Sequence, residues 1–100
     1  MKKEEYNTST RNPVILDFAH CKTFNDMYDI ISVPFGFPKF FGKNPDALWD
    51  CMRDYCEKGT RVIVKGSKNI HEDLKDEFEL IIRVFNRLHK EIPNITFEII

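Results

Sequence analysis

The sequence lacks an excess of either charge, any long apolar run and an apolar leader. Its 15 Lys and Arg residues nearly balance 16 Asp and Glu residues, which gives a formal net charge of −1. This balance excludes a generally basic nucleic-acid-binding protein, so any electrostatic function must come from local patterning. No apolar run approaches the roughly 20 residues of a membrane span, and the charged start MKKEEYNTSTRN precedes no signal-peptide-like apolar segment. We therefore predict no signal peptide and no membrane partner.

Cysteine and histidine are also scarce. The three cysteines are Cys21, Cys51 and Cys56. Their odd number, without C-x-x-C spacing or a secretion signal, indicates reduced thiols. The three histidines are scattered, and none pairs with a cysteine at zinc-ligand spacing. We therefore predict no metal site and no cofactor.

The chain is long enough for one folded domain. Its 42% apolar content is spread without a biased stretch. The first 12 residues are polar and predict a flexible N-terminal arm, with a single domain over 13–100. Short β-branched and aromatic runs predict strands at 14–18, 61–66 and 95–100. Apolar periodicity predicts helices at 24–33, 45–58 and 74–92, the last with a break near 75 as an alternative. Strands joined by helical crossovers imply an α/β fold with a parallel sheet.

The helix at 45–58 has an unusual distribution of charge. Asn44 and Pro45 provide a favourable N-cap and first position. Four carboxylates then follow at intervals of four, four and three: Asp46, Asp50, Asp54 and Glu57. Like charges at this spacing repel by a few tenths of a kcal/mol per pair. A solvated face is the simplest interpretation, with Arg53 pairing with Asp50 or Glu57. The opposite side carries the predicted docking face: Ala47, Leu48, Cys51, Met52 and Tyr55.

Aromatic residues beside this acidic stripe favour a binding surface. Trp49 lies next to Asp50, off the centre of the apolar face. A partly exposed tryptophan flanked by carboxylates is typical of an interaction hot spot, although a position at the rim of the core is an equal alternative. The preceding loop crowds four phenylalanines, of which at least two should fill the core: Phe35, Phe37, Phe40 and Phe41. Gly42 suggests backbone that another molecule can approach closely.

The block FPKFFGKNPDALWDC resembles the signature of the barstar family. The predicted order of strands and helices also fits that family, and the resemblance covers about residues 13–100. It implies a small three-stranded parallel sheet packed with three to four helices. It further implies a non-enzymatic, cytoplasmic immunity or antitoxin protein that blocks a cytotoxic ribonuclease. The loop and acidic helix would enter the basic cleft of that nuclease toxin in place of RNA phosphate, in a 1:1 complex that contains no nucleic acid.

The resemblance also implies a set of partner-binding residues. Positions that match the family's contacts in the loop and acidic helix are Phe40, Gly42, Asn44, Asp46, Trp49, Asp50 and Arg53. Asp54 is added from the stripe alone. Our alignment places Val84 at a contact position in the last helix, and Arg87 where an acidic residue is expected. Lys43 likewise replaces an acidic residue. We therefore expect Lys43 and Arg87 to influence which nuclease the protein binds.

Two other function classes fit the residues less well. Catalysis is disfavoured because adjacent His20 and Cys21 diverge on any regular element, and because Asp46 and Asp50 lack a histidine or metal partner. A single-stranded nucleic-acid or protein-binding module could use the phenylalanine-rich loop with Lys39 and Lys43. The neighbouring acidic stripe would repel the same nucleic-acid backbone. Cys51, on the predicted docking face, is expected to be a buried thiol without a functional role.

Overall fold

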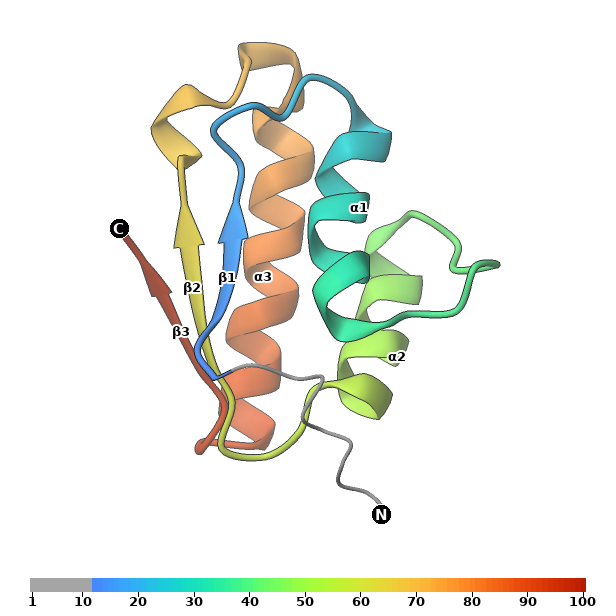
Figure 1. The fold of residues 1–100 in the computed structure, drawn as a ribbon, viewed down its shortest axis with the longest axis vertical. Helices are drawn as coiled ribbons and strands as arrows, with labels where there is room; N and C mark the ends of the chain where they lie inside the picture. Colours follow the sequence, from blue (N-terminus) through green and yellow to red (C-terminus); the bar gives the residue numbers. More distant parts are fainter. Residues whose placement is uncertain (1–11) are drawn as a thin grey trace.

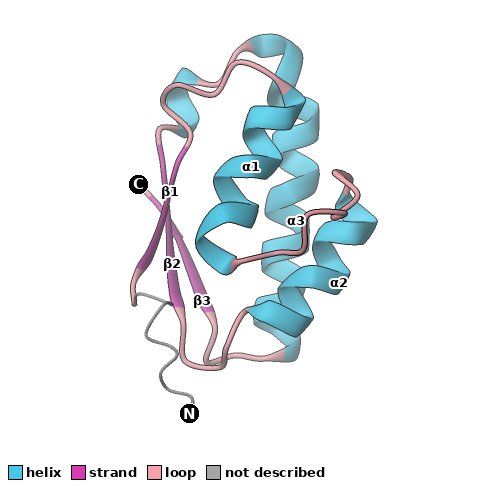
Figure 2. Cartoon of the chain, turned by 45° about the vertical axis from the view of Figure 1, so that its right-hand side comes forward, coloured by secondary structure: helices cyan, strands magenta, loops and turns pink. Residues whose placement is uncertain are grey.

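The computed structural model describes residues 12–100, which form a three-stranded sheet with helices on one face (Figures 1 and 2). The elements, in chain order, are β1 (Val14–Asp17), α1 (Phe24–Phe35), α2 (Pro45–Tyr55), β2 (Arg61–Lys65), the short 3-10 helices η2 (Ser67–Asn69) and η3 (Glu72–Leu74), α3 (Lys75–Glu91) and β3 (Thr96–Ile99). The α/β prediction is confirmed. Residues 1–11 of the predicted arm lie outside the described residues.

The sheet has the order β1-β2-β3, and both strand pairs are parallel. Val14 pairs with Val62, and Val62 pairs with Phe97. Burial alternates along β1 and β2, because one face of the sheet packs on the helices while the other faces solvent. Asn12 belongs to this folded unit: its side chain donates to the Gly59 carbonyl at 3.1 Å and accepts from the Arg61 N–H at 2.8 Å.

Helix α1 begins as predicted and ends two residues later than predicted. Thr23 is the N-cap and forms a capping box with Asp26. The loop expected from Pro34 instead starts after Phe35. Pro34 lies in the final turn of α1 and has no N–H to donate. The helix ends there with a hydrogen bond in which the Phe37 N–H donates to the Ser32 carbonyl at 3.1 Å. Gly36 permits this closure because its φ is 69°, in the left-handed region.

Helix α2 also begins as predicted, but it ends three residues before the predicted end. The Asn44 side chain accepts from the Ala47 N–H at 2.8 Å, and Pro45 occupies the first turn. After Tyr55 the chain becomes extended at Cys56, whose side chain is buried. The predicted end at Lys58-Gly59 was therefore wrong, because burial of Cys56 draws the chain out of the helix. Glu57 consequently lies outside the helix that carries the other three carboxylates.

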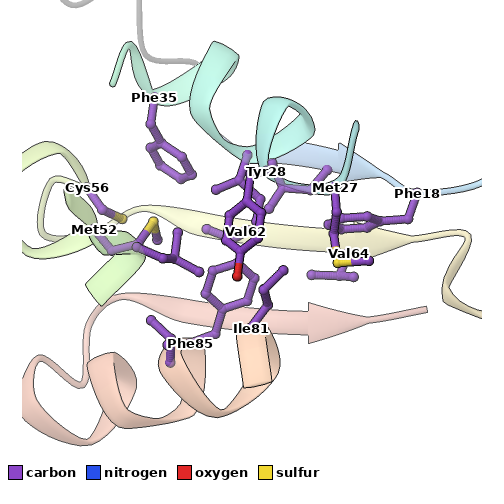
Figure 3. Packing of buried hydrophobic residues seen from close by; sticks show 14 of the residues in the cluster. Phe18, Met27, Tyr28, Phe35, Met52, Cys56, Val62, Val64, Ile81 and Phe85 are labelled. Atoms are coloured by element: carbon purple, nitrogen blue, oxygen red, sulfur yellow. The ribbon is translucent and has the colours of Figure 1, made fainter. Parts of the chain in front are cut away.

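Helix α3 supplies much of the core. The structure favours the alternative of a break near residue 75, since η3 ends at Leu74 and α3 follows it directly. The buried side chains of α3 are Ile81, Val84, Phe85 and Leu88. They pack with residues of β2, α1 and α2 in one cluster, part of which is drawn in Figure 3. Figures 1 and 2 show α1 and α3 beside the sheet, with α2 on their outer side.

Candidate partner-binding surface

The outer face of α2 carries three exposed carboxylates, those of Asp46, Asp50 and Asp54. Spacing of four residues along an α-helix separates them by about 6 Å per step. Among residues 12–100, none of the three carboxylates has an ion-pair partner. The structure therefore places three uncompensated negative charges in a row on a capped helix. Glu57, the predicted fourth member of this stripe, lies beyond the end of the helix.

Trp49 lies beside this row and is covered by two arginines. Its side chain is half-buried and packs against the core, and the Arg87 guanidinium carbon lies 3.9 Å from its ring centroid. The Arg53 guanidinium carbon lies 5.5 Å from the same centroid. We call Trp49, Arg53 and Arg87 the Trp49 platform. Both distances are within the range of cation–π attraction. Trp49 is thus both a rim-of-core residue and part of the exposed surface.

Arg53 does not form the ion pairs predicted for it. Its Nε lies 3.9 Å from Oε1 of Glu91, at the end of α3. Arg53 therefore links α2 to α3, and the expected pairing with Asp50 or Glu57 is wrong. The physical reason is that the two packed helices bring Glu91 within reach of Arg53, and spacing along α2 alone could not reveal this contact.

Arg87 and Val84 occupy different environments on α3. Arg87 is exposed, and its stack on Trp49 brings it to the same surface as the carboxylate row. Val84 retains 9% of its surface and belongs to the core cluster. The structure thus gives Arg87 a surface position beside α2, while Val84 has little area to offer a partner.

The loop before α2 presents one aromatic ring. Phe35, Phe37 and Phe41 are buried, and Phe41 contacts Phe37 edge-to-face with ring centroids 5.0 Å apart. Phe40, by contrast, is 89% exposed. The prediction that at least two of the four phenylalanines fill the core is confirmed. Phe40 is thus the ring of this loop that a partner can reach.

Backbone and charge contacts position the end of this loop. The Asn44 N–H donates to the Gly42 carbonyl at 2.7 Å. This hydrogen bond fixes the exposed Gly42 next to Asn44, the N-cap of α2. A Cβ at Gly42 would lie 3.7 Å from the Ala47 Cβ, an ordinary contact distance. The Lys43 ammonium pairs with Asp29 of α1 at 2.9 Å. Its positive charge is therefore compensated within the chain.

The buried side of α2 differs from the predicted docking face at Tyr55, while Cys51 packs against the core but is not fully buried. Leu48 and Met52 are buried as expected, with Ala47 packed against them at the edge of the core. Tyr55 is 41% exposed, because the helix ends there and Cys56 takes the inner position. Cys51 is half-buried, so the prediction of a buried thiol was wrong.

The thiols are in their free form and weakly acidic. Burial raises the pKa of Cys51, and the carboxylates of Asp54 and Asp50 raise it further. Burial raises the pKa of Cys56 to about 11. A raised pKa lowers the thiolate fraction at neutral pH and with it the reactivity of the sulfur. These cysteines therefore do not provide an activated nucleophile at this surface.

Two residues of the surface were absent from the predicted set. Asp29 neutralises Lys43, and Glu91 pairs with Arg53. Neither residue is adjacent in sequence to the cation that it contacts, so only the packing of α1 and α3 against the α2 region reveals them. No cluster of potential metal ligands occurs within residues 12–100, and no helix in that range is long and apolar enough to cross a membrane.

Comparisons with known proteins agree on one relationship. Residues 11–99 match the family model described as "Barstar (barnase inhibitor)". A Bacillus subtilis (strain 168) protein named "Putative ribonuclease inhibitor YrdF" is 28% identical over 87 residues. That alignment covers 69% of this chain and 96% of the relative.

Proposed function

The chain belongs to the barstar family, and from this premise we propose that it inhibits a ribonuclease by inserting α2 and the preceding loop into the active-site cleft. The observation that carries the proposal is the row of uncompensated carboxylates on α2. A ribonuclease cleft must attract a polyanion, so it presents cations that the three carboxylates can satisfy in place of phosphates. Because α2 is capped and packed on the core, the row is already ordered before binding, which lowers the entropy lost in the complex.

The side chains next to the carboxylate row each have a different proposed role in binding. Phe40 projects from the loop as an apolar contact, and Asn44 fixes the direction of α2 through its cap. Trp49 supplies aromatic area next to Asp50, the pattern of an interface anchor surrounded by polar groups. We propose a 1:1 complex in which Asp46, Asp50 and Asp54 face the phosphate-binding groups of the enzyme.

The proposed setting is the cytoplasm of the cell that makes the protein, where it would act as an immunity protein or antitoxin. All three cysteines are unpaired, as expected for a protein of a reducing compartment. An inhibitor held there protects cellular RNA from a toxic nuclease. Such protection needs binding alone.

A nucleic-acid-binding module is the second candidate, and the exposed Phe40 is the observation that favours it. Base stacking on aromatic rings supports single-strand binding when several rings line a positive groove. The other two phenylalanines of this loop, Phe37 and Phe41, lie in the core, and Lys43 is paired with Asp29. The carboxylates of α2 would oppose a phosphate backbone beside that single ring. The geometry therefore supports ribonuclease inhibition better.

An inhibition assay separates the two candidates. We expect the protein to slow RNA hydrolysis by at least one enzyme in a panel of secreted bacterial ribonucleases that includes barnase. It should not retard the same RNA in the absence of enzyme. The Asp46→Ala/Asp50→Ala double variant is the control and should lose the inhibition. Retardation of free RNA at the inhibitory concentration would instead support the nucleic-acid-binding module.

Association with the inhibited ribonuclease should be strongly salt-dependent. Opposite charges on the cleft and on α2 steer the encounter, and added salt screens this attraction beyond about 8 Å at physiological ionic strength. We expect the association rate constant from stopped-flow mixing to fall at least tenfold between about 20 mM and about 500 mM salt. Phe40→Ala should retain this slope, since it removes no charge. A rate constant that stays flat would contradict electrostatic steering and favour a contact driven by shape.

A further inference from the structure

Arg87 is an uncompensated cation next to the carboxylate row of α2. Lys43 pairs with Asp29, and Arg53 lies within ion-pair distance of Glu91. Within residues 12–100, the Arg87 guanidinium makes no ion pair and no hydrogen bond to a side chain. Its one specific contact is the stack on the Trp49 ring at 3.9 Å. The surface therefore has two signs of charge, with Arg87 beside a row of three carboxylates.

The stacking geometry prepares Arg87 to bind an anion. A guanidinium that lies over an aromatic ring is held by cation–π attraction, while the N–H donors in its plane remain free. Such a planar fork matches the two oxygens of a carboxylate. Because Trp49 restricts the side chain beforehand, less conformational entropy is lost when the partner binds.

We propose that Arg87, held by Trp49, is a specificity-determining residue that binds an acidic side chain at the rim of the ribonuclease cleft. This inference rests on the proposed function and adds the chemistry of the partner. The target would place cations opposite Asp46, Asp50 and Asp54, and a carboxylate opposite Arg87. A ribonuclease whose cleft has a uniformly basic rim would meet repulsion at Arg87. Partner choice within a shared binding mode is commonly set by such unfavourable charge contacts.

Barnase serves as the probe, because an RNA-degrading enzyme must have a cleft that attracts phosphate. We expect weak inhibition by the unmodified protein and at least tenfold tighter inhibition by Arg87→Glu. The matched control is Lys68→Glu, which changes the net charge equally. Lys68 is exposed in η2. The segment that contains η2 lies away from α2 in Figure 1. The charge reversal in Lys68→Glu should change the inhibition of barnase by less than threefold, because only the long-range electrostatic attraction is altered.

A reciprocal experiment tests the acidic partner directly. The Lys and Arg residues around the barnase cleft are changed to Glu one at a time. We expect at least one of these enzymes to bind the unmodified protein tenfold more tightly, and this gain should vanish with Arg87→Ala. Circular dichroism and thermal unfolding should show that each Arg87 variant remains folded, as expected for an exposed side chain.

The outcomes separate this inference from the proposed function. Inhibition that depends on Asp50 but responds equally to Arg87→Glu and Lys68→Glu would overturn the role of Arg87 while supporting the function. The role of Arg87 is likewise overturned if no rim substitution of barnase improves binding. No inhibition of any enzyme in the ribonuclease panel, by the unmodified protein or by any variant, would contradict both proposals.

Discussion

Replacing Asp50 with alanine is expected to weaken binding to the inhibited ribonuclease by about 30-fold to about 5,000-fold. Asp50 is exposed at the middle of the carboxylate row, next to Trp49. Truncating one partner of a buried interfacial charge pair costs about 2–5 kcal/mol, largely because the other charge is left desolvated and unpaired. The complex of barnase with its inhibitor is among those from which this range comes. Folding should be little affected, because the Asp50 side chain faces solvent and pairs with no cation in residues 12–100.

The measurement is a titration of the enzyme with each variant, together with chemical denaturation of the free proteins. Glu79→Ala is the matched control, since Glu79 is an exposed carboxylate in the first half of α3, whereas the Trp49 platform contacts its second half. The control should change the dissociation constant less than threefold. An Asp50→Ala variant with the affinity of the control would exclude the carboxylate row from the interface.

Replacing Gly66 with alanine should destabilise the protein by about 2–5 kcal/mol. Gly66 has a φ of 74°, and an alanine in the left-handed region costs roughly 1–2 kcal/mol. A Cβ there would also lie 2.4 Å from the Ala19 nitrogen and 2.8 Å from the Ala19 Cα. These atoms are backbone in the turn after β1, which is held next to β2 by the Phe18 N–H, the donor to the Lys65 carbonyl at 2.9 Å. Overpacking of this kind adds roughly 1–3 kcal/mol.

Gly36→Ala isolates the steric part of this effect. Gly36 has nearly the same φ, 69°, but a Cβ built there meets nothing within 4 Å. We expect its unfolding free energy to fall by roughly 1–2 kcal/mol, the conformational strain alone. Urea denaturation of both variants makes the comparison. Equal losses would show that the backbone near Ala19 yields to the added methyl group.

The start of α2 could be predicted from sequence, whereas its end could not. Asn44 and Pro45 act locally, through one cap hydrogen bond and one fixed backbone angle, so their effect is visible in the sequence. Gly59 was predicted to end the helix, yet it belongs to the turn in which the Thr60 N–H donates to the Glu57 carbonyl at 3.2 Å. The helix ends earlier because Cys56 is buried, and burial depends on the whole fold.

The surface shows the same division between local and distant causes. The carboxylate row follows from spacing along one helix and was predicted from the residues. The contact of Arg87 with Trp49 joins two helices, so apolar periodicity could not identify it; only the resemblance placed Arg87 near this surface. The compensation of Lys43 by Asp29 was missed for the same reason. Charges on one element can be read from sequence, but their partners on other elements require the packed structure.

The parallel sheet has a consequence for how the protein folds. Neither strand pair is a hairpin, since Val14 pairs with Val62 and Val62 with Phe97. Closing a loop of about 50 residues costs on the order of 3 kcal/mol of chain entropy before any strand contact compensates for it. A helix forms within about 0.1–1 μs, whereas non-local strand pairing is slow because this entropy is lost before the strand contacts form. We therefore expect the carboxylate row, which lies within α2, to form early in folding. The Trp49–Arg87 stack joins helices on either side of β2 in the chain and should form last. A partly folded chain would then carry the charge that we propose attracts a ribonuclease, without the contact that we propose selects one.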